Sequence, residues 1–227
     1  MVVYRWSESP IDGNIDGVVA VNLVVDGLAG RLSDYAAAGG ELLLTVRTAT
    51  KNEHDRLRDE LAPGPLSGAL GARIEQHESL APGLETAVSY DGDTYDYRTW
   101  GEWLQSETAT VVGRHESGVA AGEPAVVRNE HGDGHVAYVG VWPEVELADA
   151  LSVALLERAG LPVGDQLPEN VRLTERDGHT WIMNFRADAV SVDPGAAGIV
   201  LGGETVPGRD LAVVDGPAHE IEISADE

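Results

Sequence analysis

The 227-residue sequence contains no cysteine, one phenylalanine and a single lysine, Lys51. The absence of cysteine excludes disulfide bonds, thiolate metal ligands and a cysteine nucleophile. No apolar run approaches the roughly 20 residues that a membrane-spanning helix needs. The first ten residues also lack the basic start and apolar centre of a signal peptide. We therefore expect a globular cytoplasmic protein with no membrane partner.

Basic residues of either kind are scarce. Thirty-nine Asp and Glu oppose fifteen Lys and Arg, which gives a formal net charge of −24 at pH 7. Such a charge repels nucleic acid, which we exclude as a partner. Any soluble acidic protein fits this balance, but the near absence of Lys and Phe beside abundant Ala, Val and Leu favours adaptation to molar salt. There the Debye length falls to about 3 Å, so the carboxylates repel one another weakly.

The first part of the chain has the pattern of an α/β layer. Residues 17–25 form a nearly continuous apolar run, which is typical of a strand covered on both faces. Asp26 can cap a helix over about 27–38, and two glycines end it. Residues 41–46 predict the next buried strand. A strand, a helix and a strand in so short a stretch predict a right-handed crossover.

The next hundred residues are less regular. A short helix is expected to begin near Pro63, and short strands are expected between 84 and 115. Apolar runs on either side of the turn residues 131–134 predict a hairpin. Leucines at spacings of four then predict an amphipathic helix over 144–161.

A stretch with the composition of a linker, 162–170, precedes short apolar runs separated by Gly, Asp and Pro. These runs predict a small all-β domain. We therefore divide the chain into residues 1–163 and residues 164–227. The expected fold is an α/β, partial flavodoxin-like or glutamine-amidotransferase-like layered domain, which the family resemblance given next implies is incomplete at its N-terminus, followed by a small antiparallel all-β sandwich.

Several stretches, taken together and in order, carry a resemblance to a known family. They are "LAGRLSDYAAAGGELLLTVRTATKNEHDRL", "PGPLSGALGARIEQHESL", "WGEWL", "GEPAVVRNEHGDGHVAYVG" and "LADALSVALLERAGL". In this order they resemble the trimerisation domain of glycoside hydrolase family 42 β-galactosidases. The tail, with "TWIMNF" and "GIVLGGETV", is similar to the small C-terminal β domain of that family.

The resemblance implies that catalysis belongs elsewhere. The family carries it on a (β/α)₈ barrel, with one glutamate as general acid/base and another as nucleophile. A barrel needs about 250 residues, and neither glutamate maps onto this sequence. We expect no catalytic residue, no cofactor and no metal in this chain, which we interpret as a C-terminal portion or one product of a split gene. The family forms homotrimers, so the expected partner is a second copy or a separately encoded barrel.

The polar stretch "RTATKNEHDR", residues 47–56, follows a buried strand at its carboxyl end. By itself it fits a solvated loop. Together with the resemblance it favours a docking loop, in which Arg47, Asn52 and Glu53 hydrogen-bond to the barrel or to a neighbouring subunit. An arginine suits a bidentate contact with a carboxylate.

Two further pairs of residues are candidates for binding. Trp100 and Trp103 can stack on a sugar ring, but aromatic residues at this spacing more often fill a core or a subunit interface, and we favour the interface. His131 and His135 flank a turn without a third ligand nearby, so we assign no metal site to them.

Three functions of different classes were compared with these features. The first is a non-catalytic assembly part of a β-galactosidase, and the second is a free-standing carbohydrate-binding module. The third is an α/β enzyme of the glutamine-amidotransferase type, which the absence of a cysteine nucleophile disfavours. The order and extent of the resemblance favour the first function.

Overall fold

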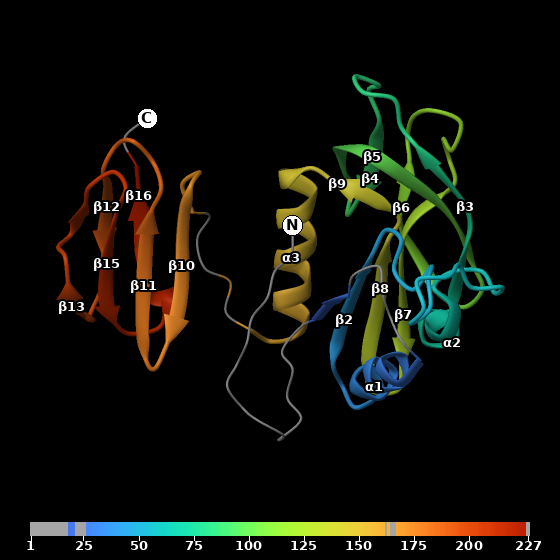
Figure 1. Ribbon diagram of the computed structural model, residues 1–227, viewed down its shortest axis with the longest axis horizontal. Coiled ribbons are helices and arrows are strands. Elements are labelled where there is room, and N and C mark those ends of the chain that lie inside the picture. Colours follow the sequence, from blue (N-terminus) through green and yellow to red (C-terminus); the bar gives the residue numbers. More distant parts are fainter. Residues whose placement is uncertain (1–17, 21–25, 162, 164–166, 226–227) are drawn as a thin grey trace. The chain divides into compact units, whose positions relative to one another are not determined.

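The computed structural model describes residues 18–20, 26–161, 163 and 167–225 (Figure 1). The chain forms two compact units, Met1–Leu161 and Pro162–Glu227. Within the described residues no helix is long and apolar enough to cross a membrane.

The first elements described in this unit are a strand, a helix and a strand. They are β1 (Val18–Ala20), α1 (Asp26–Ala37) and β2 (Glu41–Thr45). Strands β1 and β2 pair in parallel, with Val18 opposite Leu42. Of the strand expected over 17–25, residues 18–20 are described, and residues 17 and 21–25 lie outside the described part.

Antiparallel strands make up most of the first unit. The remaining elements are η1 (Gly64–Leu66), α2 (Ser67–Leu70), β3 (Ala72–Ser79), β4 (Ala87–Tyr90), β5 (Asp93–Ser106), β6 (Thr110–His115), β7 (Pro124–His131), β8 (Gly134–Val139), β9 (Val141–Pro143) and α3 (Val145–Arg158). The sheet order is β1-β2-β8-β7-β6-β4-β5-β3, with β9 paired to β5. Among the described strands, only β1–β2 and β2–β8 pair in parallel. The domain is therefore rich in sheet, and its crossover layer is confined to the first strands.

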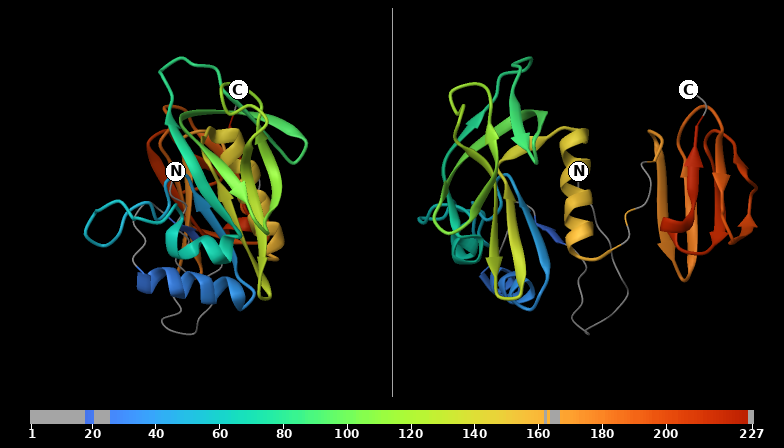
Figure 2. Two further views of the ribbon diagram at one scale, coloured as in Figure 1. Left: turned by 90° about the vertical axis from the view of Figure 1, so that its right-hand side faces the viewer. Right: turned by 180° about the vertical axis from the view of Figure 1, so that it is seen from behind.

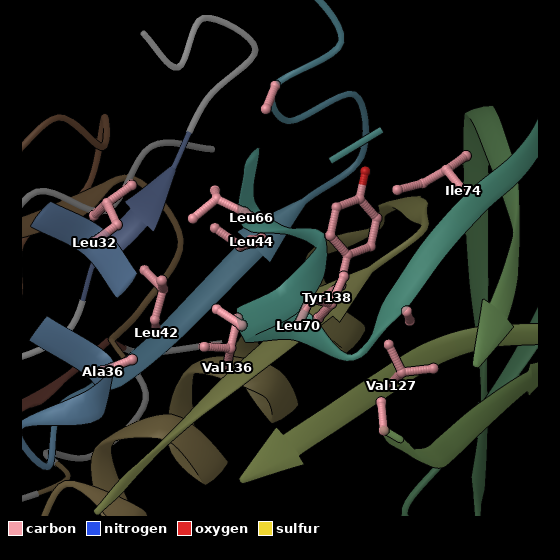
Figure 3. Packing of buried hydrophobic residues seen from close by; sticks show 14 of the residues in the cluster. Leu32, Ala36, Leu42, Leu44, Leu66, Leu70, Ile74, Val127, Val136 and Tyr138 are labelled. Carbon is pink, nitrogen blue, oxygen red and sulfur yellow. The ribbon is translucent and has the colours of Figure 1, made fainter. Parts of the chain in front are cut away.

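Helices cover both faces of this sheet. Successive side chains of a strand point to opposite faces, so Leu42 and Leu44 pack on one side with Leu32 of α1, and Leu43 packs on the other side with Leu151 of α3. Figure 3 shows the first of these clusters between α1, α2 and the sheet. Figures 1 and 2 show α1 and α2 beside each other on the face opposite α3.

The predicted hairpin at 131–134 joins β7 to β8 and packs against the end of α1. The amide of Asp133 donates to the carbonyl of Ala37 at 3.0 Å, and the amide of His135 donates to that of Gly40 at 3.1 Å. A Cβ on Gly134 would overlap the Gly40 carbonyl oxygen, so only glycine allows this approach. The hairpin thereby aligns β8 beside β2.

The second unit consists of two small antiparallel sheets. Its elements are β10 (Val171–Arg176), β11 (His179–Asn184), β12 (Val190–Asp193), β13 (Gly198–Leu201), β14 (Thr205–Val206), β15 (Asp210–Asp215), η2 (Ala218–Glu220) and β16 (Glu222–Ser224). The sheet orders are β10-β11-β15-β13 and β14-β12-β16. Ile182 and Val214 are among the residues of the core cluster. Trp181 on β11 and Phe185 after it remain exposed.

Candidate assembly surface

The chain leaves β2 through a tight turn that begins the polar stretch. Arg47 and Ala49 have positive φ angles of 69° and 55°, which non-glycine residues adopt only when the surroundings hold them there. The Thr48 hydroxyl donates to the carbonyl of Thr45 at 2.6 Å. The Thr50 hydroxyl donates to the carbonyl of Arg47 at 3.1 Å. Local threonine hydrogen bonds thus stabilise the turn.

A buried carboxyl group lies beneath this turn. Glu102 on β5 is 1% exposed. Its Oε1 accepts the backbone N–H of Arg47 at 3.1 Å, and its Oε2 accepts the hydroxyl of Tyr138 at 2.6 Å. Burial raises the pKa of Glu102 to about 7, although these two hydrogen bonds and the Arg47 charge act in the opposite direction. Glu102 therefore fixes the turn to β5 and to β8.

Above the turn, the Arg47 side chain lies on an aromatic pair. Its Cζ atom is 5.0 Å from the ring centroid of Trp100, within the range of a cation–π contact. The Trp100 ring meets the Trp142 ring edge to face, with centroids 5.4 Å apart. Trp142 is 38% exposed. These three residues form a surface that we call the Arg47–Trp100–Trp142 surface.

Strand pairing explains how residues so far apart in sequence form this surface. Arg98 lies opposite Trp142 and Gly101 lies opposite Val141, with an irregularity of the β5–β9 register between them. The irregularity places Trp100 beside the strand that carries Trp142. Arg98 is held by Glu144 at 2.6 Å beside the surface.

His115 on β6 is a second buried polar group, and it holds strand β5. The Nε2 atom of His115 donates to the backbone carbonyl of Glu102 at 3.0 Å, and its Nδ1 accepts from the hydroxyl of Tyr97 at 3.1 Å. Burial lowers the pKa of His115 and raises that of Tyr97 to about 12. Both side chains are therefore neutral near pH 7, and they act as a structural tie between β5 and β6.

The other residues predicted for the docking loop lie in a small hairpin at 51–57. The Asn52 side-chain oxygen accepts the backbone N–H groups of His54 and Arg56, which makes Asn52 a turn-forming residue. Glu53 is exposed and lies 3.7 Å from His54. Lys51 pairs with Asp55 at 2.8 Å. Of the three predicted docking residues, the structure brings only Arg47 to Trp100.

Trp103 lies apart from the Arg47–Trp100–Trp142 surface. It pairs with Gln76 across β5 and β3, and its indole nitrogen is buried without a hydrogen-bond partner among the described residues. Trp142 was not predicted, although its position at the end of an apolar strand was a weak signal. Nothing in the sequence predicted that Glu102 lies below the turn.

The two histidines at the hairpin have other partners. His131 contacts the hydroxyl of Ser33 at 2.9 Å. His135 lies 2.6 Å from Glu41, whose other oxygen accepts from Arg158 at 3.2 Å. In the described part of the chain, no three His, Asp or Glu side chains are grouped in a way that could hold a metal ion.

The described residues of the first unit form a sheet-rich domain with an arginine-aromatic surface. Comparison with known proteins places this domain in a family. The family of β-galactosidase trimerisation domains matches residues 18–162. The β-galactosidase BgaH of Haloferax lucentense is 45% identical over 214 residues, which cover 93% of this chain and 32% of that protein. The β-galactosidase Bga of Halorubrum lacusprofundi is 45% identical over 190 residues, which cover 77% of this chain and 27% of that protein.

A solved structure agrees with these relatives. The polyextremophilic β-galactosidase from the Antarctic haloarchaeon Halorubrum lacusprofundi has a TM-score of 0.82 at 41% identity, covering 89% of this chain and 31% of that one. The chain therefore belongs to the β-galactosidase trimerisation domain family. It spans 32% and 27% of the length of the two haloarchaeal relatives. The resemblance seen in the sequence is confirmed, and the haloarchaeal relatives support the expected halophilic character.

Proposed function

We propose that this chain is the assembly part of a β-galactosidase and that the Arg47–Trp100–Trp142 surface contacts a neighbouring subunit. The observation that carries the proposal is an arginine stacked on Trp100, whose ring meets Trp142, in a chain of net charge −24. Arg and Trp are the residue types that most often dominate the energy of protein interfaces. A cationic group on an otherwise acidic chain suits an acidic partner surface, such as another copy of the chain.

The rigidity of the surface supports this role. The Arg47 backbone is held by Glu102, and the Trp100 ring is packed between the guanidinium and Trp142. A surface that is ordered before binding loses little conformational entropy when a partner docks. We propose that the exposed Glu53 of the neighbouring hairpin lies at the rim of the same contact, and that Asn52 shapes that hairpin.

The assembly proposal is tested by the mass of the chain in molar KCl, measured by sedimentation at several concentrations. We expect self-association, with a trimer near three times the chain mass of 24.0 kDa. Trp142→Ala should weaken it. Trp181→Ala is the matched control, because Trp181 in the second unit is 40% exposed and Trp142 is 38% exposed. A wild-type chain that stays monomeric, or equal loss in both variants, would contradict the proposal.

We also propose that the chain by itself does not hydrolyse β-galactosides. A retaining glycosidase needs two carboxyl groups about 5 to 5.5 Å apart beside a bound sugar. The described strands contain only two parallel pairings, which do not form a (β/α)₈ barrel. A chromogenic galactoside in molar salt tests this. Turnover that disappears when one carboxylate of this chain is replaced would refute it.

A carbohydrate-binding role is the second candidate, and the exposed face of Trp142 is the observation that favours it. Binding of galactose or lactose that is lost in Trp142→Ala, in a chain that stays monomeric, would support this role over assembly. The division of the chain at residue 163, the flavodoxin-like description of the first layer and the cytoplasmic location stay predictions.

A further inference from the structure

We propose that Glu102 positions the Arg47–Trp100–Trp142 surface, and that the proton on the Glu102 carboxyl group couples assembly through this surface to pH. The coupling rests on the assembly function proposed above, whereas the positioning role rests only on contacts within the chain. The two parts are therefore tested by separate measurements.

The hydrogen bonds around Glu102 fit its ionised form. Both carboxylate oxygens act as acceptors, one for the Arg47 amide and the other for the Tyr138 hydroxyl. If Glu102 binds a proton, its own O–H becomes a donor and competes for position with the Arg47 amide or the Tyr138 hydroxyl, which now point at its oxygens. Protonation thus disturbs the hydrogen bonds that hold the turn.

Burial favours the protonated form of Glu102. Glu102 is 1% exposed, and a carboxylate removed from water is strongly disfavoured relative to the neutral acid. The two effects oppose each other, and the pKa of Glu102, raised by burial to about 7, places the change in charge close to neutral pH. A small change in pH near 7 therefore changes how firmly Glu102 holds the Arg47 turn.

Two other ionisable side chains with shifted pKa values face Glu102. Tyr138 on β8 has a pKa raised well above its ordinary value, by burial first and by the Glu102 charge second, so it stays neutral. His115 on β6 has a pKa lowered by burial, partly offset by its hydrogen bond to the Glu102 backbone and by the charges of Glu78 on β3 and Glu123. The Arg47 guanidinium is the positive charge that favours ionised Glu102. Burial thus raises the pKa of Glu102 to about 7, while it lowers the pKa of His115 and raises that of Tyr138.

The effect of protonating Glu102 is transmitted to the Arg47–Trp100–Trp142 surface through the Arg47 turn. Arg47 has a φ of 69°, which is strained for a non-glycine residue and needs support from its neighbours. Ionised Glu102 supplies that support through its hydrogen bond and through attraction to the guanidinium. Neutral Glu102 supplies less of both. The guanidinium then leaves the Trp100 ring more readily, and Trp100 contacts Trp142 less regularly.

The positioning role is tested by circular dichroism of the coupled tryptophan pair in molar KCl, between about pH 5 and pH 9. The band is assigned by its loss in Trp142→Phe. We expect it to strengthen as pH rises, with a midpoint near the pKa of about 7. Glu102→Gln keeps an acceptor for the Arg47 amide but has no charge to lose, so its band should be independent of pH. Glu130→Gln, at an exposed position of β7, is the matched control and should follow the wild type.

The coupling to assembly is tested by sedimentation of the same variants at both ends of this pH range. We expect the wild type to associate about tenfold more tightly at high pH, a typical size for coupling between two sites. The association constant of Glu102→Gln should change less than twofold between the two ends of this pH range. A pH-independent band in the wild type, or a wild-type pH profile in Glu102→Gln, would overturn the positioning role. A normal band titration in a chain that never associates would overturn assembly and its coupling while supporting the positioning role.

Discussion

Replacing Glu102 by glutamine should raise the stability of the fold at neutral and alkaline pH. The folded pKa of Glu102 lies above the value of the unfolded chain, so its stabilising contribution is complete below about pH 4.5 and is lost as pH rises through about 7. Above pH 7 the wild type must keep a carboxylate in its core. The amide of glutamine has almost the same shape and carries no such charge.

The size of the effect follows from the pKa. A rise from 4.5 to about 7 corresponds to about 3 kcal/mol against the folded state above pH 7, since each pKa unit is worth about 1.4 kcal/mol. Glutamine offers one oxygen to two donors, and a poorer hydrogen bond costs about 1 kcal/mol. We therefore expect Glu102→Gln to be about 2 kcal/mol more stable than the wild type above pH 7, and about 1 kcal/mol less stable below pH 4.5.

Urea unfolding in molar KCl at several pH values measures this difference, because urea leaves the ionic strength unchanged. The free energies of unfolding of the two proteins should cross between pH 4.5 and 7. Glu130→Gln serves as the control and should run parallel to the wild type. If Glu102→Gln also runs parallel to the wild type, or is less stable at every pH, then Glu102 is not a carboxyl group whose burial opposes its ionisation.

Three other perturbations test the fold. The melting temperature should rise with added KCl, because screening reduces repulsion among the excess carboxylates, and a flat or falling curve would contradict the halophilic interpretation. Gly134→Ala should destabilise the first unit by about 1 to 3 kcal/mol, since its Cβ would overlap the Gly40 carbonyl, whereas Gly27→Ala in α1 meets nothing within 4 Å and should not. Leu44→Ala should cost about 2 to 5 kcal/mol by calorimetry because Leu44 is fully buried, while the same change at the exposed Leu57 should cost little.

The elements predicted from sequence were those with a strong local signal. The glycines near position 40 do end α1, and the turn at 131–134 does join two strands. The leucine pattern of 144–161 corresponds to α3, Val145–Arg158. Each signal depends on side-chain periodicity or turn chemistry within about 20 residues, which a single sequence displays directly.

The arrangement of the site depended on contacts between distant residues. Glu102 and Tyr138 meet because β5 pairs with β9, which follows β8 directly, and the amide of Glu102 donates to the carbonyl of Gly140 at 2.6 Å. Trp100 reaches Trp142 through an irregular β5–β9 pairing that no local pattern indicates. The sequence pointed to Arg47 as a polar residue after a strand, but it could not show which groups this residue would touch, and its docking role stays a prediction.

The single lysine of the chain offers a site for selective chemical labelling. The Lys51 side chain is 37% exposed and lies in the hairpin that follows the Arg47 turn. A small amine-reactive fluorophore on it would report from beside the Arg47–Trp100–Trp142 surface, and Lys51→Arg would identify signal from any other amine. Quenching of the fluorophore as copies are mixed would then follow docking in real time, without introducing a cysteine into a chain that has none.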